Sequence, residues 1–141
     1  MSKFAEVRGR SLIGRLAVIL FSVISIVLPG CSESPGIQPG GDAAAARDAL
    51  TTALDAWKGG NDPKSLQSGE KAFWVTDEDW KSGKKLTDYR IAEEVEQSGG
   101  HWRVCAELTI SDSGQSASSE RICYAVTIAE AISIIRSDFL Y

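Results

Sequence analysis

The strongest constraint on the fold is an alternation of apolar and polar residues in two segments, 102–110 and 121–128, which flank Asp112-Ser113-Gly114-Gln115. Successive side chains of a strand point to opposite faces, so an apolar residue at every second position indicates a strand with one buried face. The short polar sequence between the segments is typical of a hairpin loop. The apolar positions are Trp102, Val104, Ala106, Leu108 and Ile110 in the first segment, and Ile122, Tyr124, Val126 and Ile128 in the second.

Two cysteines lie on the other face of this predicted hairpin. Apolar residues face each other only if paired positions add up to an even number, because a slip of one residue turns a whole strand over. A hairpin centred on Gly114 pairs Glu107 with Arg121 and Cys105 with Cys123. Directly opposed cysteines come within disulfide reach, so we predict a Cys105–Cys123 disulfide. The alternative is two unpaired thiols on an outer face.

A helix is predicted over 43–58, ahead of the strands. Asp42 is a good N-cap, an alanine-rich run follows, and Gly59-Gly60 supplies a stop. Leu50, Leu54 and Trp57 have the spacing of one helical face. Further expected elements are a short helical turn after Asn61-Asp62-Pro63, a short strand over 71–75, a helical turn capped by Thr76, and strands over 86–95 and 131–138.

These elements predict an α+β fold in which one long N-terminal helix packs on a curved four-stranded antiparallel meander. The order resembles the cystatin-like or NTF2-like arrangement. The chain is also similar to small lipoproteins of planctomycete-type bacteria. The residues that carry this likeness are structural, so the resemblance implies no activity; they are 53–59, 63–66, 75–80, 86–89 and 134–136.

The start of the chain has the layout of an export signal. A nearly apolar run, Leu16–Leu28, follows four basic residues and ends at Pro29-Gly30-Cys31. A basic start, an apolar middle and a small residue at the cleavage site are typical of secretory leaders. The run is short for a membrane span, which needs about 20 apolar residues. Plain secretion and an uncleaved anchor are the alternatives.

The sequence Leu28-Pro29-Gly30-Cys31 resembles the lipobox of bacterial lipoproteins, although Pro29 departs from the small or hydroxyl residue usual there. This resemblance implies cleavage between Gly30 and Cys31 and acylation of Cys31, for example by palmitate. It predicts a signal peptide over 1–30, a flexible tether over 31–41 and a single domain over 42–141. The protein is then expected in the cell envelope, anchored by lipid to a membrane and facing the periplasm or exterior.

The net charge excludes one class of partner. The chain carries −4, and its leader has four basic residues and one acid, so the mature chain carries −7. Such a chain lacks the basic surface that nucleic acid requires, and we expect no nucleic-acid partner.

Candidate chemistry is sparse, and we expect no catalytic residue, metal or cofactor. The acidic run Asp77-Glu78-Asp79 lacks the ligand spacing of a calcium loop and suits a helix start. Asp88, Tyr89 and Tyr124 are candidates for a catalytic carboxylate with tyrosine donors, but core tyrosines explain the pattern better. The single histidine, His101, has no partner residues for a metal site or triad.

The four tryptophans are numerous for such a small domain, and most should lie in the core. Trp74 and Trp80 lie on irregular segments and are candidates for a contact surface. The expected function is therefore a non-catalytic binding or interaction module that recognises an envelope protein. The alternative is a small-ligand pocket, enzymatic or not, inside the curved sheet. An empty polar cavity beside the helix would favour the pocket, and a filled core with an exposed aromatic patch would favour the interaction module.

Overall fold

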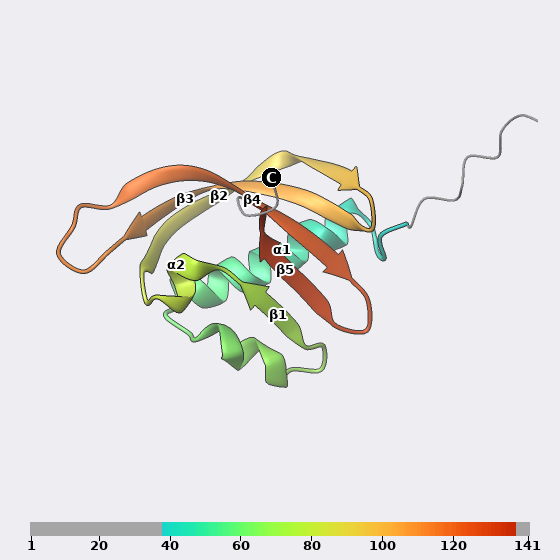
Figure 1. The fold of residues 1–141 in the computed structure, drawn as a ribbon, viewed down its shortest axis with the longest axis horizontal. Helices are drawn as coiled ribbons and strands as arrows, with labels where there is room; N and C mark the ends of the chain where they lie inside the picture. Colours follow the sequence, from blue (N-terminus) through green and yellow to red (C-terminus); the bar gives the residue numbers. More distant parts are fainter. Residues whose placement is uncertain (1–37, 138–141) are drawn as a thin grey trace, which may run out of the picture. The chain divides into compact units, whose positions relative to one another are not determined.

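The computed structural model describes residues 38–137. These residues form a mixed sheet with one main helix and two shorter ones (Figure 1). The elements in chain order are α1 (Ala43–Lys58), the 3-10 helix η1 (Pro63–Ser68), β1 (Phe73–Thr76), α2 (Glu78–Lys81), β2 (Lys85–Ser98), β3 (His101–Ser111), β4 (Ser118–Ile128) and β5 (Ile132–Arg136).

The predicted fold class is wrong. The sheet has five strands in the order β1-β5-β4-β3-β2, and β1 pairs with β5 in parallel, so it is neither four-stranded nor a purely antiparallel meander. The cystatin-like or NTF2-like arrangement is accordingly not adopted. Phe73 and Val75 explain the fifth strand, because their side chains join the core when β1 lies beside Ile132 and Ile134.

The predicted hairpin register is confirmed at every pair named above. Glu107 lies opposite Arg121, and Cys105 lies opposite Cys123. The two cysteine sulfur atoms lie 1.96 Å apart, at disulfide distance. The strand predicted over 131–138 is present as β5, paired antiparallel with β4.

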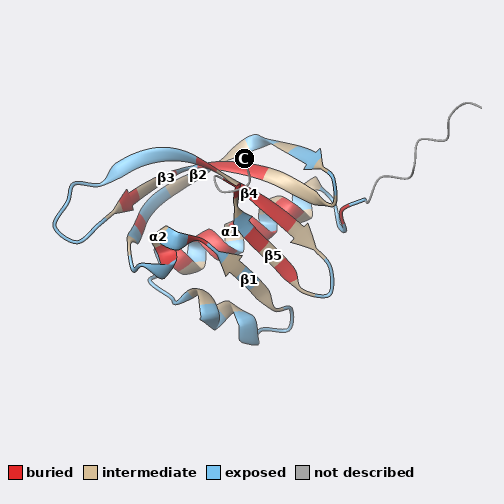
Figure 2. Ribbon diagram, in the orientation of Figure 1, coloured by how far each residue is buried: buried red, intermediate tan, exposed pale blue. Residues whose placement is uncertain are grey.

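The core lies between α1 and one face of the sheet. The Asp42 side chain caps the helix by accepting a 2.7 Å hydrogen bond from the backbone N–H of Ala45, and α1 spans the predicted residues. Figure 2 shows buried residues along α1 and on the central strands. The buried set includes Ala46, Leu50, Leu54 and Trp57 from the helix and Val104, Leu108, Tyr124, Val126 and Ile134 from the sheet.

Strand β2 departs from regular pairing at two points. Ile91 pairs with Ala106 and Val95 pairs with Val104, so three residues of β2 face Cys105 alone. A second shift lies between Leu86 and Asp88. Extra residues in one strand bend it away from its partner. The strand predicted over 86–95 is present within β2, which is longer than predicted and is interrupted by this bulge.

The leader, including Gly30 and Cys31, lies outside the described residues. Of the predicted tether, only 38–41 is described, and Pro39 within it is buried. Neither α1 nor the shorter helices of the described part of the chain combine the length and hydropathy that a membrane crossing needs.

Candidate functional site

The sheet has an outer face, which we define as the face opposite α1. Cys123 and Ala125 on β4 lie on it, out of phase with the core residue Tyr124. Ala125 is paired with Ile135 of β5, so Ile135 shares this face. Any binding site on this side of the sheet is therefore built by residues that alternate with the core.

Two large hydrophobic side chains are exposed on the outer face of the β1–β5 pair. Trp74 is 54% exposed and Ile135 is 37% exposed. Trp74 pairs with Ser133, and Ile135 pairs with Thr76, which makes Trp74 and Ile135 diagonal neighbours on one face. Phe73 and Val75 must face the core, so the pleat leaves Trp74 no position but the outer face. We call Trp74 and Ile135 the aromatic patch.

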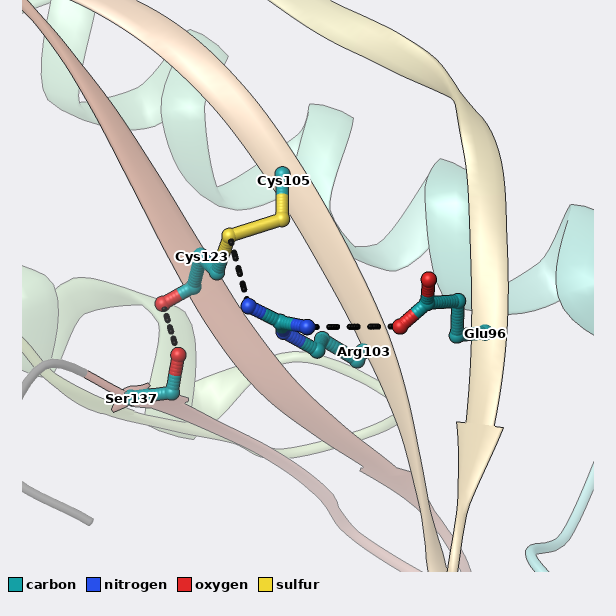
Figure 3. Close-up of a disulfide and its surroundings, with 5 residues drawn as sticks. All are labelled: Glu96, Arg103, Cys105, Cys123 and Ser137. Atoms are coloured by element: carbon teal, nitrogen blue, oxygen red, sulfur yellow. Dashed lines mark hydrogen bonds and ion pairs between the residues drawn. A yellow bond between two sulfur atoms is a disulfide. The ribbon is translucent and has the colours of Figure 1, made fainter. Parts of the chain in front are cut away.

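Beside the disulfide, the outer face carries a groove of about 360 Å³, which we call the disulfide groove. Arg103 crosses it, with Nη1 3.3 Å from Glu96 Oε2 and Nη2 3.8 Å from the sulfur of Cys123 (Figure 3). The hydroxyl of Ser137 donates a 2.7 Å hydrogen bond to the carbonyl of Cys123. The remaining lining residues are Glu94, Cys105 and Arg121.

A second hollow, of about 440 Å³, adjoins the same bulge of β2 and shares Arg121 with the disulfide groove. Its lining includes the ion pair between Arg90 Nη2 and Glu107 Oε2, at 2.8 Å. The bulge explains both hollows, because it carries β2 away from β3 opposite Cys105. Chemically, these hollows offer paired charges of both signs, which suits polar contacts with a partner surface.

The predicted acidic run caps a helix and joins three elements. Asp77 is 2% exposed, and its Oδ1 accepts hydrogen bonds from the backbone N–H groups of Asp79 and Trp80. The cap of α2 is therefore Asp77, not Thr76 as predicted. The hydroxyl of Tyr124 donates to the other oxygen of Asp77 at 2.8 Å. Asp77 thus ties the start of α2 to β4.

Asp79 is held by two cations. Arg136 Nη1 lies 2.5 Å from its Oδ2, and Lys84 Nζ lies 2.6 Å from its Oδ1. Burial opposes ionisation of Asp79, but these hydrogen bonds and charges outweigh burial and hold its pKa below the ordinary value. The acidic run is occupied with structural pairing. Within residues 38–137, no three acidic, histidine or cysteine side chains converge closely enough to hold a metal ion.

The three candidates for catalysis do not form one site. Tyr124 hydrogen-bonds to the buried Asp77, whereas Asp88 pairs with Lys58 at 2.9 Å. The hydroxyl of Tyr89 donates to Asp55 at 2.5 Å. Burial, together with the hydrogen bond and charge of Asp55, raises the pKa of Tyr89 to about 12. Each tyrosine therefore serves a different carboxylate.

The two tryptophans proposed for a contact surface differ in position. Trp80 is buried and stacks on Trp57, with ring centroids 5.4 Å apart, so it belongs to the core. Trp74 alone of this pair is exposed. His101 is the first residue of β3, next to the Gly99-Gly100 turn, and pairs with Ser98.

The grooves were not predicted, although one residue signalled the bulge that forms them. Glu93 occupies a position that an uninterrupted β2 would turn toward the core, between Ile91 and Val95. A charged residue at an apolar position is a sign of a bulge.

The chain matches no protein-family model, no curated protein sequence and no solved structure.

Proposed function

We propose that the protein is a lipid-anchored module of the bacterial cell envelope that binds another envelope protein through its outer face. The anchor rests on the leader and on Leu28-Pro29-Gly30-Cys31. The placement of Cys105 and Cys123 at disulfide distance supports an oxidising compartment, because such bonds persist outside the cytoplasm.

The aromatic patch carries the proposal of protein binding. Trp74 and Ile135 are adjacent on the outer face, and a tryptophan is among the residues most enriched at the energetic centre of protein interfaces. Exposed apolar patches on an otherwise polar surface mark interaction sites. The paired charges around the disulfide groove supply a polar surround on the same face.

The packing between α1 and the sheet favours a protein partner over a small ligand. Leu50, Leu54 and Tyr124 are each 2% exposed or less, and they fill the space beside the helix where an internal pocket was the alternative. The hydroxyl of Tyr124 donates its hydrogen bond to Asp77, which is itself buried, so it is not available to a ligand. A filled core with an exposed aromatic patch is the arrangement expected of an interaction module.

The partner can be tested by cross-linking the anchored protein in intact cells and identifying the captured proteins by mass spectrometry. Wild type is compared with Trp74→Ser/Ile135→Ser and with the control Gln115→Ala, which alters the exposed β3–β4 loop. We expect one envelope protein to be captured by wild type and control and lost with the double variant. Equal capture by all three proteins would exclude the aromatic patch as the binding surface for the captured protein.

The anchor is tested separately, by feeding cells labelled palmitate. Wild type should take up the label, and Cys31→Ala should not. Label retained by Cys31→Ala, or a mature protein that still begins at Met1, would contradict the lipid anchor.

A further inference from the structure

Residues 38–41, which were predicted to be part of a flexible tether, are attached to one end of the sheet. The indole N–H of Trp102 donates a 3.1 Å hydrogen bond to the carbonyl of Gly40, and Gln97 Nε2 donates to Gln38 Oε1 at 3.3 Å. Pro39 between them is buried. We call residues 38–41 the seat. Trp102 is the second residue of β3 and Gln97 the second-to-last of β2, so the seat lies beside the β2–β3 turn.

Glycine is required in the seat because the chain passes against backbone. A Cβ added to Gly40 would lie 2.0 Å from the carbonyl oxygen of Ile128, which no side chain could tolerate. Gly41 has φ +67°, and its Cβ would lie 2.9 Å from Cδ1 of Ile128. The seat is therefore fitted between the end of β4 and the start of β3. Asp42, the N-cap of α1, follows directly.

The seat brings the lipid-bearing side of the chain to one end of the domain. In Figure 1 the cyan start of the described chain lies beside the β2–β3 turn, while the β3–β4 loop lies at the opposite end of the sheet. Only residues 32–37 separate Cys31 from the seat. Seven Cα steps span at most about 25 Å whatever their conformation. The seat therefore stays within about 25 Å of the lipid-bearing residue. This distance is similar to the length of α1, about 24 Å for its 16 residues.

The turns at the seat end carry few formal charges, and these nearly balance. The turns at this end are Gly99-Gly100, Ala129–Ala131 and residues 69–72, since Ala72 is hydrogen-bonded to Ile132 at the start of β5. Their residues with a formal charge are Glu70, Lys71 and Glu130. The mature domain as a whole carries −7, after the loss of a leader whose net charge is +3 from a chain at −4. Anionic lipid repels a domain of negative net charge, but the charges of these turns sum to only −1, so repulsion at this end is weak.

We infer that the seat fixes the orientation of the domain on its membrane, with the β2–β3 and β4–β5 turns against a lipid surface and the β3–β4 loop directed away from it. This inference rests on the proposed lipid anchor at Cys31. The outer face then stands at an angle to the bilayer and stays open to a partner beside the protein.

The test uses the full chain, purified from membranes with its lipid and reconstituted into nanodiscs that contain a lipid with a gadolinium-chelating headgroup. Paramagnetic broadening of backbone amide signals by NMR reports proximity to the headgroups. We expect amides of 98–101 and 129–131 to broaden several-fold more than those of 112–115. Equal broadening at the two ends, in protein that still co-sediments with lipid vesicles, would overturn the orientation and leave the anchor intact. Failure to co-sediment would overturn both.

The role of the seat itself is tested with Gly40→Val, which cannot fit beside Ile128, and with Gly36→Val as the matched substitution outside the seat. Gly40→Val should lose the difference between the two ends, and Gly36→Val should keep it. Trp102→Phe removes only the indole donor to Gly40 and serves if Gly40→Val does not fold. Trp102→Phe should reduce the difference in broadening between the two ends of the sheet, while the amide signals of β3 and β4 keep their positions. An unchanged orientation in both Gly40→Val and Trp102→Phe would contradict the proposal that the seat orients the domain.

Discussion

Tyr124 of β4 and Asp77, the cap of α2, are joined by a 2.8 Å hydrogen bond inside the core. Both side chains are almost fully buried, at 1% and 2% exposure. A polar pair in this position is stable only because each oxygen of Asp77 has a donor: the Tyr124 hydroxyl on one, and backbone N–H groups of α2 on the other. The pair thus connects the sheet to the segment between β1 and β2.

Replacing Tyr124 with Phe should lower the free energy of unfolding by about 1–3 kcal/mol, because a buried acceptor loses its donor. Tyr89→Phe is the matched control. Its hydrogen bond to Asp55 is at the surface, so its removal should change stability by about 0.5 kcal/mol or less. Urea unfolding followed by tryptophan fluorescence measures both. Equal losses in the two variants would contradict a special role for the Tyr124–Asp77 pair.

Acid should destabilise the domain through Asp79. Its pKa is lowered in the folded state, so its stabilising contribution is fully present above the ordinary value of 3.8 and is lost as pH falls through the lower folded value. Unfolding free energies measured in urea from neutral pH down to about pH 3 should therefore decline in wild type. Asp79→Asn, which cannot ionise, should be less stable at neutral pH and show a shallower decline. If the unfolding free energy of Asp79→Asn declined with pH as steeply as that of wild type, Asp79 would not be the cause of the acid sensitivity.

The disulfide should matter more for stability than any single surface contact. Cys105 and Cys123 are separated by 18 residues in sequence, and closing a loop of this size stabilises a protein by about 3 kcal/mol. We expect Cys105→Ala/Cys123→Ala to lose that amount in urea unfolding. Alkylation of denatured, unreduced protein recovered from cells supplies an independent check. Two modified thiols per chain would show that the bond does not form in the cell.

The same substitution at two tryptophans should have opposite consequences. Trp80→Ala removes a buried ring that stacks on Trp57 and should cost about 3–5 kcal/mol. Trp74→Ala removes an exposed ring and should change stability by about 0.5 kcal/mol or less, while weakening partner capture. Thermal unfolding and the cross-linking assay separate the two effects. A large loss of stability in Trp74→Ala would identify that side chain as structural instead.

Local patterns predicted the central hairpin and α1 but not the complete sheet. The parity of the apolar residues excludes any odd shift, which would expose Val104 and Tyr124, and a turn centred on Gly114 then pairs Cys105 with Cys123. β1 has four residues, and its partner β5 begins more than fifty residues later, so no local pattern reveals that they pair. The disulfide groove was likewise not predicted, since it depends on how far the bulge of β2 moves that strand away from β3. The aromatic patch was anticipated only as one of two candidate tryptophans.

The position of β5 between β1 and β4 has a consequence for biogenesis. The strand that links β1 to the rest of the sheet is the final one of the described chain, so β1 has no lateral partner until residues 132–136 have been synthesised. Contacts that are this distant in sequence form late and slowly. The β2–β3 and β3–β4 pairs can form before β5 exists, so β1 joins the sheet as its last step.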